Sequence, residues 1–133
     1  MMPTTAPETA PRGATIRGLL PAIIAFMLLG AHFYRDGLVP LVPSCIGAIA
    51  MLFVRLPWVR YLAVGALVLA AAEWSRTLVA LVAGRIEAGE PWLRLASILV
   101  AVAAFTLLSA WPFRSAVLRR WYAGGRASAA PDR

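Results

Sequence analysis

Glu73 and Arg76 carry opposite charges inside a long apolar stretch of the chain. They are three residues apart, so on a helix the two side chains are neighbours and can form an ion pair. Thr77 places a hydroxyl group beside them. Charged groups in an apolar helix are functional candidates, but a paired carboxylate and guanidinium also serve structure. We therefore expect this pair either to bind or titrate, or to fix how helices pack.

Further polar residues flank the same apolar segments. His32, Arg35 and Asp36 close the first segment, and Arg94 opens the last. We predict that these residues converge on one polar cluster in the outer half of a helix bundle. The functional interpretation is a binding pocket, a proton-titrating site or a docking surface, and the structural one is a salt-bridge network. The predicted cluster consists of His32, Arg35, Asp36, Glu73, Arg76, Thr77 and Arg94.

The sequence favours neither catalysis nor metal binding. One histidine and one cysteine cannot supply the three or four protein ligands of a typical zinc site. The scattered serines lack the motif of a nucleophile elbow, and the glycines do not form a phosphate-binding loop. We predict no catalytic residue, no metal centre and no cofactor. Cys45 is expected to act as a small hydrophobic residue.

Four apolar stretches must position the cluster, at residues 18–34, 38–54, 58–84 and 92–113. A helix crosses the hydrocarbon core of a bilayer, about 30 Å thick, with roughly 17–25 apolar residues. Charged residues make up 14% of the chain, against about 25% in soluble domains. Short connections make consecutive helices antiparallel. The sequence therefore predicts an all-α integral membrane protein, an antiparallel up-down four-helix transmembrane bundle.

The two ends of the chain differ from this central domain. Residues 1–17 are rich in Pro, Thr and Ala, which predicts a disordered tail. Residues 114–133 are basic and partly amphipathic, which predicts a tail along the membrane surface that frays at Gly124 and Gly125.

Orientation follows from the arginines, which make up all 13 basic residues. Nine belong to the tails and the second connection, and three to the other two connections. Because basic residues concentrate on the cytoplasmic side, we predict that both termini are cytoplasmic. The nine are Arg12, Arg17, Arg55, Arg60, Arg114, Arg119, Arg120, Arg126 and Arg133, and the three are Arg35, Arg85 and Arg94.

Three segments resemble a family of small, functionally uncharacterised four-helix inner-membrane proteins of bacteria. They are residues 31–37 (AHFYRDG), 73–77 (EWSRT) and 89–95 (GEPWLRL). The resemblance implies the inner (plasma) membrane but no activity. The size is also similar to that of the small multidrug-resistance transporters. Those carry an essential glutamate in their first helix, whereas residues 18–34 contain none.

We expect a non-enzymatic membrane protein, an accessory or assembly subunit of a membrane complex. Its expected partners are the lipid bilayer and either another membrane protein or further copies of the chain, and not nucleic acid. The alternative is a small oligomeric transporter or channel in which Glu73 titrates, since four helices rarely enclose a pathway alone. A third alternative is an enzyme with a lipid-facing reaction at His32 and Asp36.

Overall fold

The structure is a computed structural model that describes residues 12–127, with side chains through residue 124. All regular secondary structure in that part of the chain is helical. In chain order the elements are α1 (Arg12–Arg35), the 3-10 helix η1 (Val39–Leu41), α2 (Val42–Met51), α3 (Pro57–Glu87), α4 (Leu93–Leu108), the 3-10 helix η2 (Trp111–Arg114) and α5 (Ala116–Ala127).

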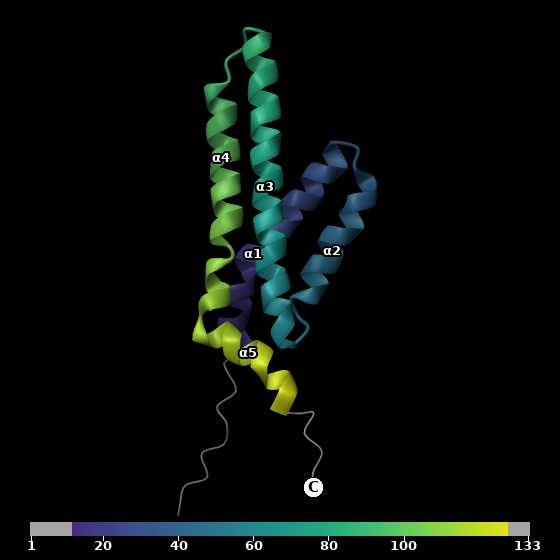
Figure 1. The fold of residues 1–133 in the computed structure, drawn as a ribbon, viewed down its shortest axis with the longest axis vertical. Helices are drawn as coiled ribbons and strands as arrows, with labels where there is room; N and C mark the ends of the chain where they lie inside the picture. The colour runs from purple at the N-terminus through teal and green to yellow at the C-terminus, as the bar shows by residue number, and fades with distance from the viewer. Residues whose placement is uncertain (1–11, 128–133) are drawn as a thin grey trace, which may run out of the picture.

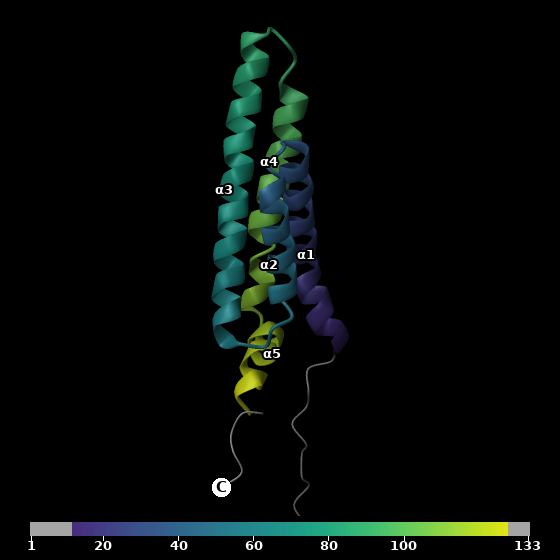
Figure 2. The same cartoon turned by 90° about the vertical axis from the view of Figure 1, so that its right-hand side faces the viewer.

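The helices form two hairpins of unequal height, as Figures 1 and 2 show. The short hairpin pairs α1 with α2, and the tall hairpin pairs α3 with α4. Most contacts between helices lie within one hairpin or the other. α5 crosses the end of the fold where α1 begins and α3 begins (Figure 1). The tall hairpin extends beyond the short one at the opposite end.

Three helical segments are long and apolar enough to cross a membrane: Arg12–Arg35, Pro57–Glu87 and Leu93–Arg114. The second predicted span, residues 38–54, contains only the shorter apolar helix Val39–Met51. At 1.5 Å per residue, these 13 residues reach about 20 Å, less than the hydrocarbon core. Pro40 and Pro43 lack backbone N–H groups, and the chain enters α2 through a 3-10 turn. The predicted four-helix transmembrane bundle is therefore not confirmed.

Glycine follows the first helix of each hairpin. Gly37 follows α1 with φ +77°, and Gly89 follows α3 with φ +67°. Only glycine takes this left-handed conformation without strain, and it lets the next N–H groups reach back to the last helical carbonyls. The N–H of Leu38 bonds the Phe33 carbonyl at 2.8 Å, and the N–H of Glu90 bonds the Arg85 carbonyl at 2.9 Å. These turns set where each hairpin reverses.

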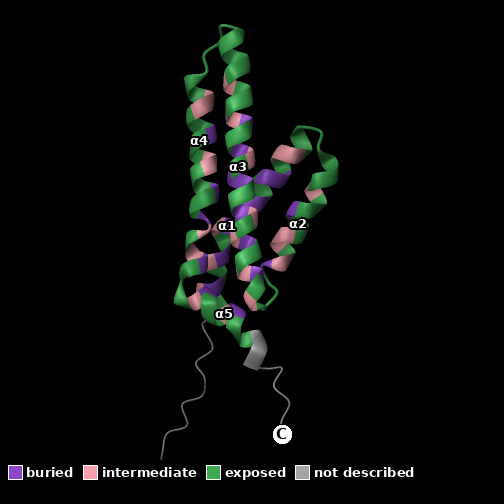
Figure 3. Cartoon of the chain, viewed as in Figure 1, coloured by how far each residue is buried: buried purple, intermediate pink, exposed green. Residues whose placement is uncertain are grey.

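The larger core lies at the end that α5 covers, where buried residues gather in Figure 3. Leu118 of α5 packs so close to α1 that a Cβ at Gly18 would lie 3.3 Å from its Cδ1. The hydroxyl of Tyr122 donates to the Leu52 carbonyl, at the end of α2, over 2.8 Å. The fully buried residues of this core include Leu19, Ala22, Leu52, Val59, Leu67, Phe113, Leu118 and Tyr122.

Parts of both predicted tails are helical. Residues 12–17, predicted to be disordered, form the first turns of α1, where Thr15 is buried. The predicted fraying at Gly124 and Gly125 is wrong, because α5 continues through both glycines to Ala127. Packing of α5 against α1 accounts for the ordered start of α1, since tertiary contacts stabilise short helical turns. The rest of each predicted tail, residues 1–11 and 128–133, lies outside the described residues.

Candidate functional site

The polar cluster forms where the short hairpin ends against the side of the tall one. His32 lies in the last turn of α1, Asp36 lies in the connection to α2, and three residues come from the middle of α3. Arg60 lies in the first turn of α3, near the end of the fold that α5 covers. Glu73 comes 13 residues later and therefore lies about 20 Å further along the helix, at 1.5 Å per residue. The chain turns from α1 toward α2 at this height along α3, so the turn after α1 determines where the cluster forms. The residues brought together are His32, Asp36, Glu73, Arg76 and Thr77.

His32 is the centre of this arrangement. Its Nε2 atom lies 3.2 Å from Thr77 Oγ1, 3.5 Å from Asp36 Oδ2 and 4.0 Å from Glu73 Oε1. Only 9% of its side chain is exposed. One ring nitrogen thus faces a hydroxyl and a carboxylate from α3 and a second carboxylate from the connection after α1. The hydrogen bond with Thr77 can run either way: a protonated Nε2 donates to Oγ1, and an unprotonated Nε2 accepts from the Thr77 hydroxyl.

Glu73 and Arg76 form the predicted ion pair. Arg76 Nε donates to Glu73 Oε2 at 2.9 Å, and Arg76 Nη2 donates to Glu73 Oε1. Two parallel hydrogen bonds give an arginine–carboxylate pair its strongest geometry. The exposed fractions of the two side chains differ, at 21% for Glu73 and 65% for Arg76. Glu73 faces α1, and Arg76 lies on the outer surface of α3.

Trp74 supports the cluster and was not predicted to belong to it. Its ring centroid lies 4.7 Å from that of His32, with the planes tilted by 34°. The indole is buried, and its Nε1 atom has no hydrogen-bond partner among the described residues. The apolar face of the indole holds the imidazole in place from one side. Its position next to Glu73 in the sequence was the only available signal.

Arg35 and Arg94 do not join the cluster, contrary to the sequence prediction. Both are exposed, and no ion pair among the described residues involves their side chains. Arg94 lies at the start of α4, beside the far end of α3. From Glu73 to Glu87, the last residue of α3, the helix rises about 21 Å. The unequal height of the hairpins therefore separates Arg94 from Glu73.

The charges of the cluster do not balance when the histidine is neutral. Asp36 and Glu73 are each negative, and among the described residues Arg76 forms an ion pair with Glu73 alone. Protonation of His32 would bring the four groups to zero net charge. The arrangement is suited to holding or passing a proton and to fixing α1 against α3. Among the described residues, no group of three or more His, Cys, Asp or Glu side chains is placed to hold a metal ion.

The chain was also compared with known proteins. It matches no protein-family model, no curated protein and no solved structure. The geometry of its own residues is therefore the basis for any functional assignment.

Proposed function

We propose that this protein is a non-enzymatic integral membrane protein that works as an accessory or assembly subunit of a membrane complex. The observation that carries the proposal is the place of Arg76. Its guanidinium lies on the outer face of a helix that carries no charge for 12 residues before Glu73 and for 8 residues after Arg76. Lipid has no hydrogen-bond partner for the Arg76 guanidinium at this level. Its partner within the chain is Glu73.

The surface around Arg76 supports the proposal. Exposed residues of α3 form a stripe at helical spacing that includes Leu69, Ala72, Arg76 and Ala83. Of the three segments long and apolar enough to cross a membrane, Leu93–Arg114 is the least covered by the rest of the protein, with 17% of its most apolar part buried, against 39% for Arg12–Arg35. A partner helix laid on this stripe would cover the apolar side chains and the ion pair together.

Site-specific photo-crosslinking in native membranes tests the proposal. A photoreactive residue at Leu69, 72% exposed on the stripe, is expected to give a discrete adduct with another polypeptide. The same group at Met27 of α1, 62% exposed, is the matched control and is expected to react with lipid. Arg76→Leu should abolish the Leu69 adduct. Recovery of the uncrosslinked chain alone from Leu69 would contradict the proposal.

We further infer a four-helix arrangement in the bacterial inner membrane, with both termini in the cytoplasm. In support, α2 runs antiparallel to α1 and returns the chain to the end covered by α5 (Figure 2). The arginines of that end outnumber those of the other. In a Cys45→Ala background, Ala88→Cys should label from outside and Ser128→Cys from inside. The reverse pattern would overturn the orientation.

A small oligomeric transporter or channel is the second candidate. It is favoured by the two carboxylates within 4.0 Å of His32 Nε2, because such a group can exchange protons during transport. A crosslinked product at twice the mass of the chain would support it. Glu73→Gln should then abolish proton coupling while expression stays normal. Retained coupling in that variant would remove Glu73 from the mechanism.

A further inference from the structure

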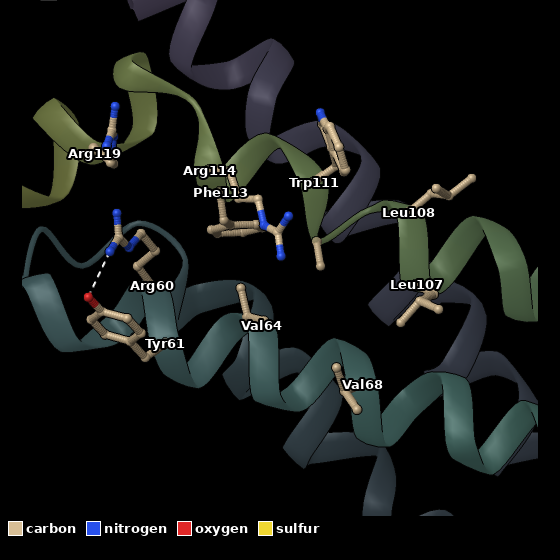
Figure 4. A pocket seen from close by; sticks show the side chains of 11 residues that line it. Arg60, Tyr61, Val64, Val68, Leu107, Leu108, Trp111, Phe113, Arg114 and Arg119 are labelled. Carbon is tan, nitrogen blue, oxygen red and sulfur yellow. Dashed lines mark hydrogen bonds between the residues drawn. The ribbon is translucent and has the colours of Figure 1, made fainter.

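A cavity of about 640 Å³ opens beside α5, far from the polar cluster. It lies between the first turns of α3, the end of α4, η2 and α5, as Figure 4 shows. Its volume falls within the range of about 300–1,000 Å³ found for small-molecule sites. The lining divides into a basic side and an apolar side.

Three arginines from three different elements line the basic side: Arg60 of α3, Arg114 of η2 and Arg119 of α5. Arg60 donates to the hydroxyl of Tyr61 at 2.8 Å, which holds its guanidinium at the edge of the cavity (Figure 4). The Cζ atom of Arg114 lies 5.5 Å from the ring centroid of Trp111. An adjoining cavity of about 200 Å³ is lined by Arg60 and Arg119 as well.

These arginines have no acidic partner among the described residues. The acidic residues that the structure describes lie in α3, from its middle onward, and in the connections that follow α1 and α3. Even Glu73 is about 20 Å along α3 from Arg60. The cavity therefore holds a surplus of positive charge that a bound anion would balance. The acidic residues concerned are Asp36, Glu73, Glu87 and Glu90.

The apolar side continues from the arginines along the groove between α3 and α4. It is formed by Val64 and Val68 of α3 and by Leu107 and Leu108 of α4. Trp111 lies between Arg114 and Leu108, and Tyr61 lies beside Arg60 (Figure 4). Aromatic side chains of this kind are enriched at the boundary between headgroups and hydrocarbon. The groove thus changes from basic to apolar in the direction in which a lipid would lie.

We propose that this groove binds an anionic phospholipid of the surrounding leaflet. The phosphate lies among Arg60, Arg114 and Arg119, and an acyl chain lies along Val64, Val68 and Leu107. Basic pockets between membrane helices bind anionic headgroups through the same chemistry. A bound lipid would also join α5 to α3 and η2, because each of these three elements supplies one of the arginines.

Native mass spectrometry of the full chain in a non-ionic detergent tests the site, with phosphatidylglycerol and phosphatidylcholine as probes. We expect one retained phosphatidylglycerol per chain and weaker retention of phosphatidylcholine. The triple variant Arg60→Gln, Arg114→Gln, Arg119→Gln should bind phosphatidylglycerol about 100-fold more weakly, since each arginine near an anionic lipid contributes roughly a factor of five. The matched control removes three exposed arginines of the same end that do not line the cavity: Arg12, Arg17 and Arg120.

The control variant should bind like the wild type. Equal losses in both triple variants, or equal retention of the two lipids, would overturn the proposal. Glycerol phosphate, which has the headgroup phosphate without acyl chains, should not compete at equal concentration. Full competition would show a free-phosphate site and would also overturn it. Should the triple variant fail to fold, Leu107→Trp fills the apolar side with every arginine in place, and undiminished phosphatidylglycerol binding would reject the groove.

Discussion

The two ends of this fold are held together by different means. Helix α5 covers one end of the fold. One buried core at that end is shared by α1, α3, η2 and the start of the α2–α3 connection, and it includes Phe113, Leu118 and Tyr122. Toward the other end a smaller core around Trp74 and Leu99 is joined by a polar cluster, and the tall hairpin continues without the short one. Helix α5 makes the difference, because it lies across several helix ends at once.

The apolar helices alone therefore do not hold the fold together. Between membrane helices the lipid is as apolar as the side chains, so burial gives little preference for protein over lipid. Close packing and hydrogen bonds must supply that preference. The end covered by α5 has both in its larger core, and the opposite half combines a smaller core with the polar contacts around His32.

The largest effect is expected from Phe113→Ala. Phe113 is 1% exposed in the core beneath α5, and truncating a buried phenylalanine costs about 3–5 kcal/mol. Phe105 of α4 is the matched control, since it is 37% exposed and its loss should cost about 0.5 kcal/mol. Thermal unfolding in detergent gives the comparison. Equal melting temperatures for the two variants would show that Phe113 does not stabilise the core beneath α5.

An intermediate effect is expected from Glu73→Ala. The change removes the partner of Arg76 and one of the two carboxylates near His32, so it should lower the melting temperature. The drop should be smaller than for Phe113→Ala, because Arg76 is mostly exposed. Glu87→Ala, at the exposed end of α3, should change the melting temperature least. If Glu73→Ala and Glu87→Ala melt together, the polar cluster does not stabilise the opposite half.

A smaller effect is expected from Tyr122→Phe, which leaves the ring in place and removes its hydrogen bond to the Leu52 carbonyl. The loss of one buried hydrogen bond should cost about 1 kcal/mol. Tyr34→Phe changes an exposed ring and should leave stability unchanged. An effect as small as that of Tyr34→Phe would mean that the α2 end is not held by α5.

The same hydroxyl makes stability depend on alkaline pH. Burial raises the pKa of Tyr122 from 10 to about 12. The protonated hydroxyl therefore contributes its full stability below pH 10, and this contribution is lost as the pH rises through about 12. Tyr122→Phe should flatten the melting temperature over that window, and an unchanged slope would exclude Tyr122 as its source.

The smallest effect is expected from Gly18→Ala. Alanine favours a helix over glycine by up to about 1 kcal/mol, but here the new Cβ would lie 3.3 Å from the buried Leu118 side chain. The gain should be largely cancelled. Gly65→Ala in α3, where nothing lies within 4 Å of the new Cβ, should keep the gain. A larger gain at Gly18 than at Gly65 would show that α5 packs less closely on α1 than described.

Part of the candidate site was predictable from the sequence, because it depends on local spacing. Glu73 and Arg76 are three residues apart on a helix, and His32 and Asp36 are four apart, so each pair had to be close whatever the tertiary structure. The contacts of Thr77 and Trp74 with His32 depend on how α1 meets α3. Arg94 was misplaced because connection lengths do not reveal that α4 starts beyond the end of the short hairpin.

The sequence by itself determined the helical class, the apolar segments and the concentration of arginine toward one end. Each of these follows from residue type and from periodicity along the chain. Only the tertiary structure decided that residues 39–51 form a short helix, that α5 closes one end, and that Arg60, Arg114 and Arg119 line one cavity. Such features depend on contacts between residues far apart in the chain, such as Tyr122 with Leu52, and local patterns carry no information about them.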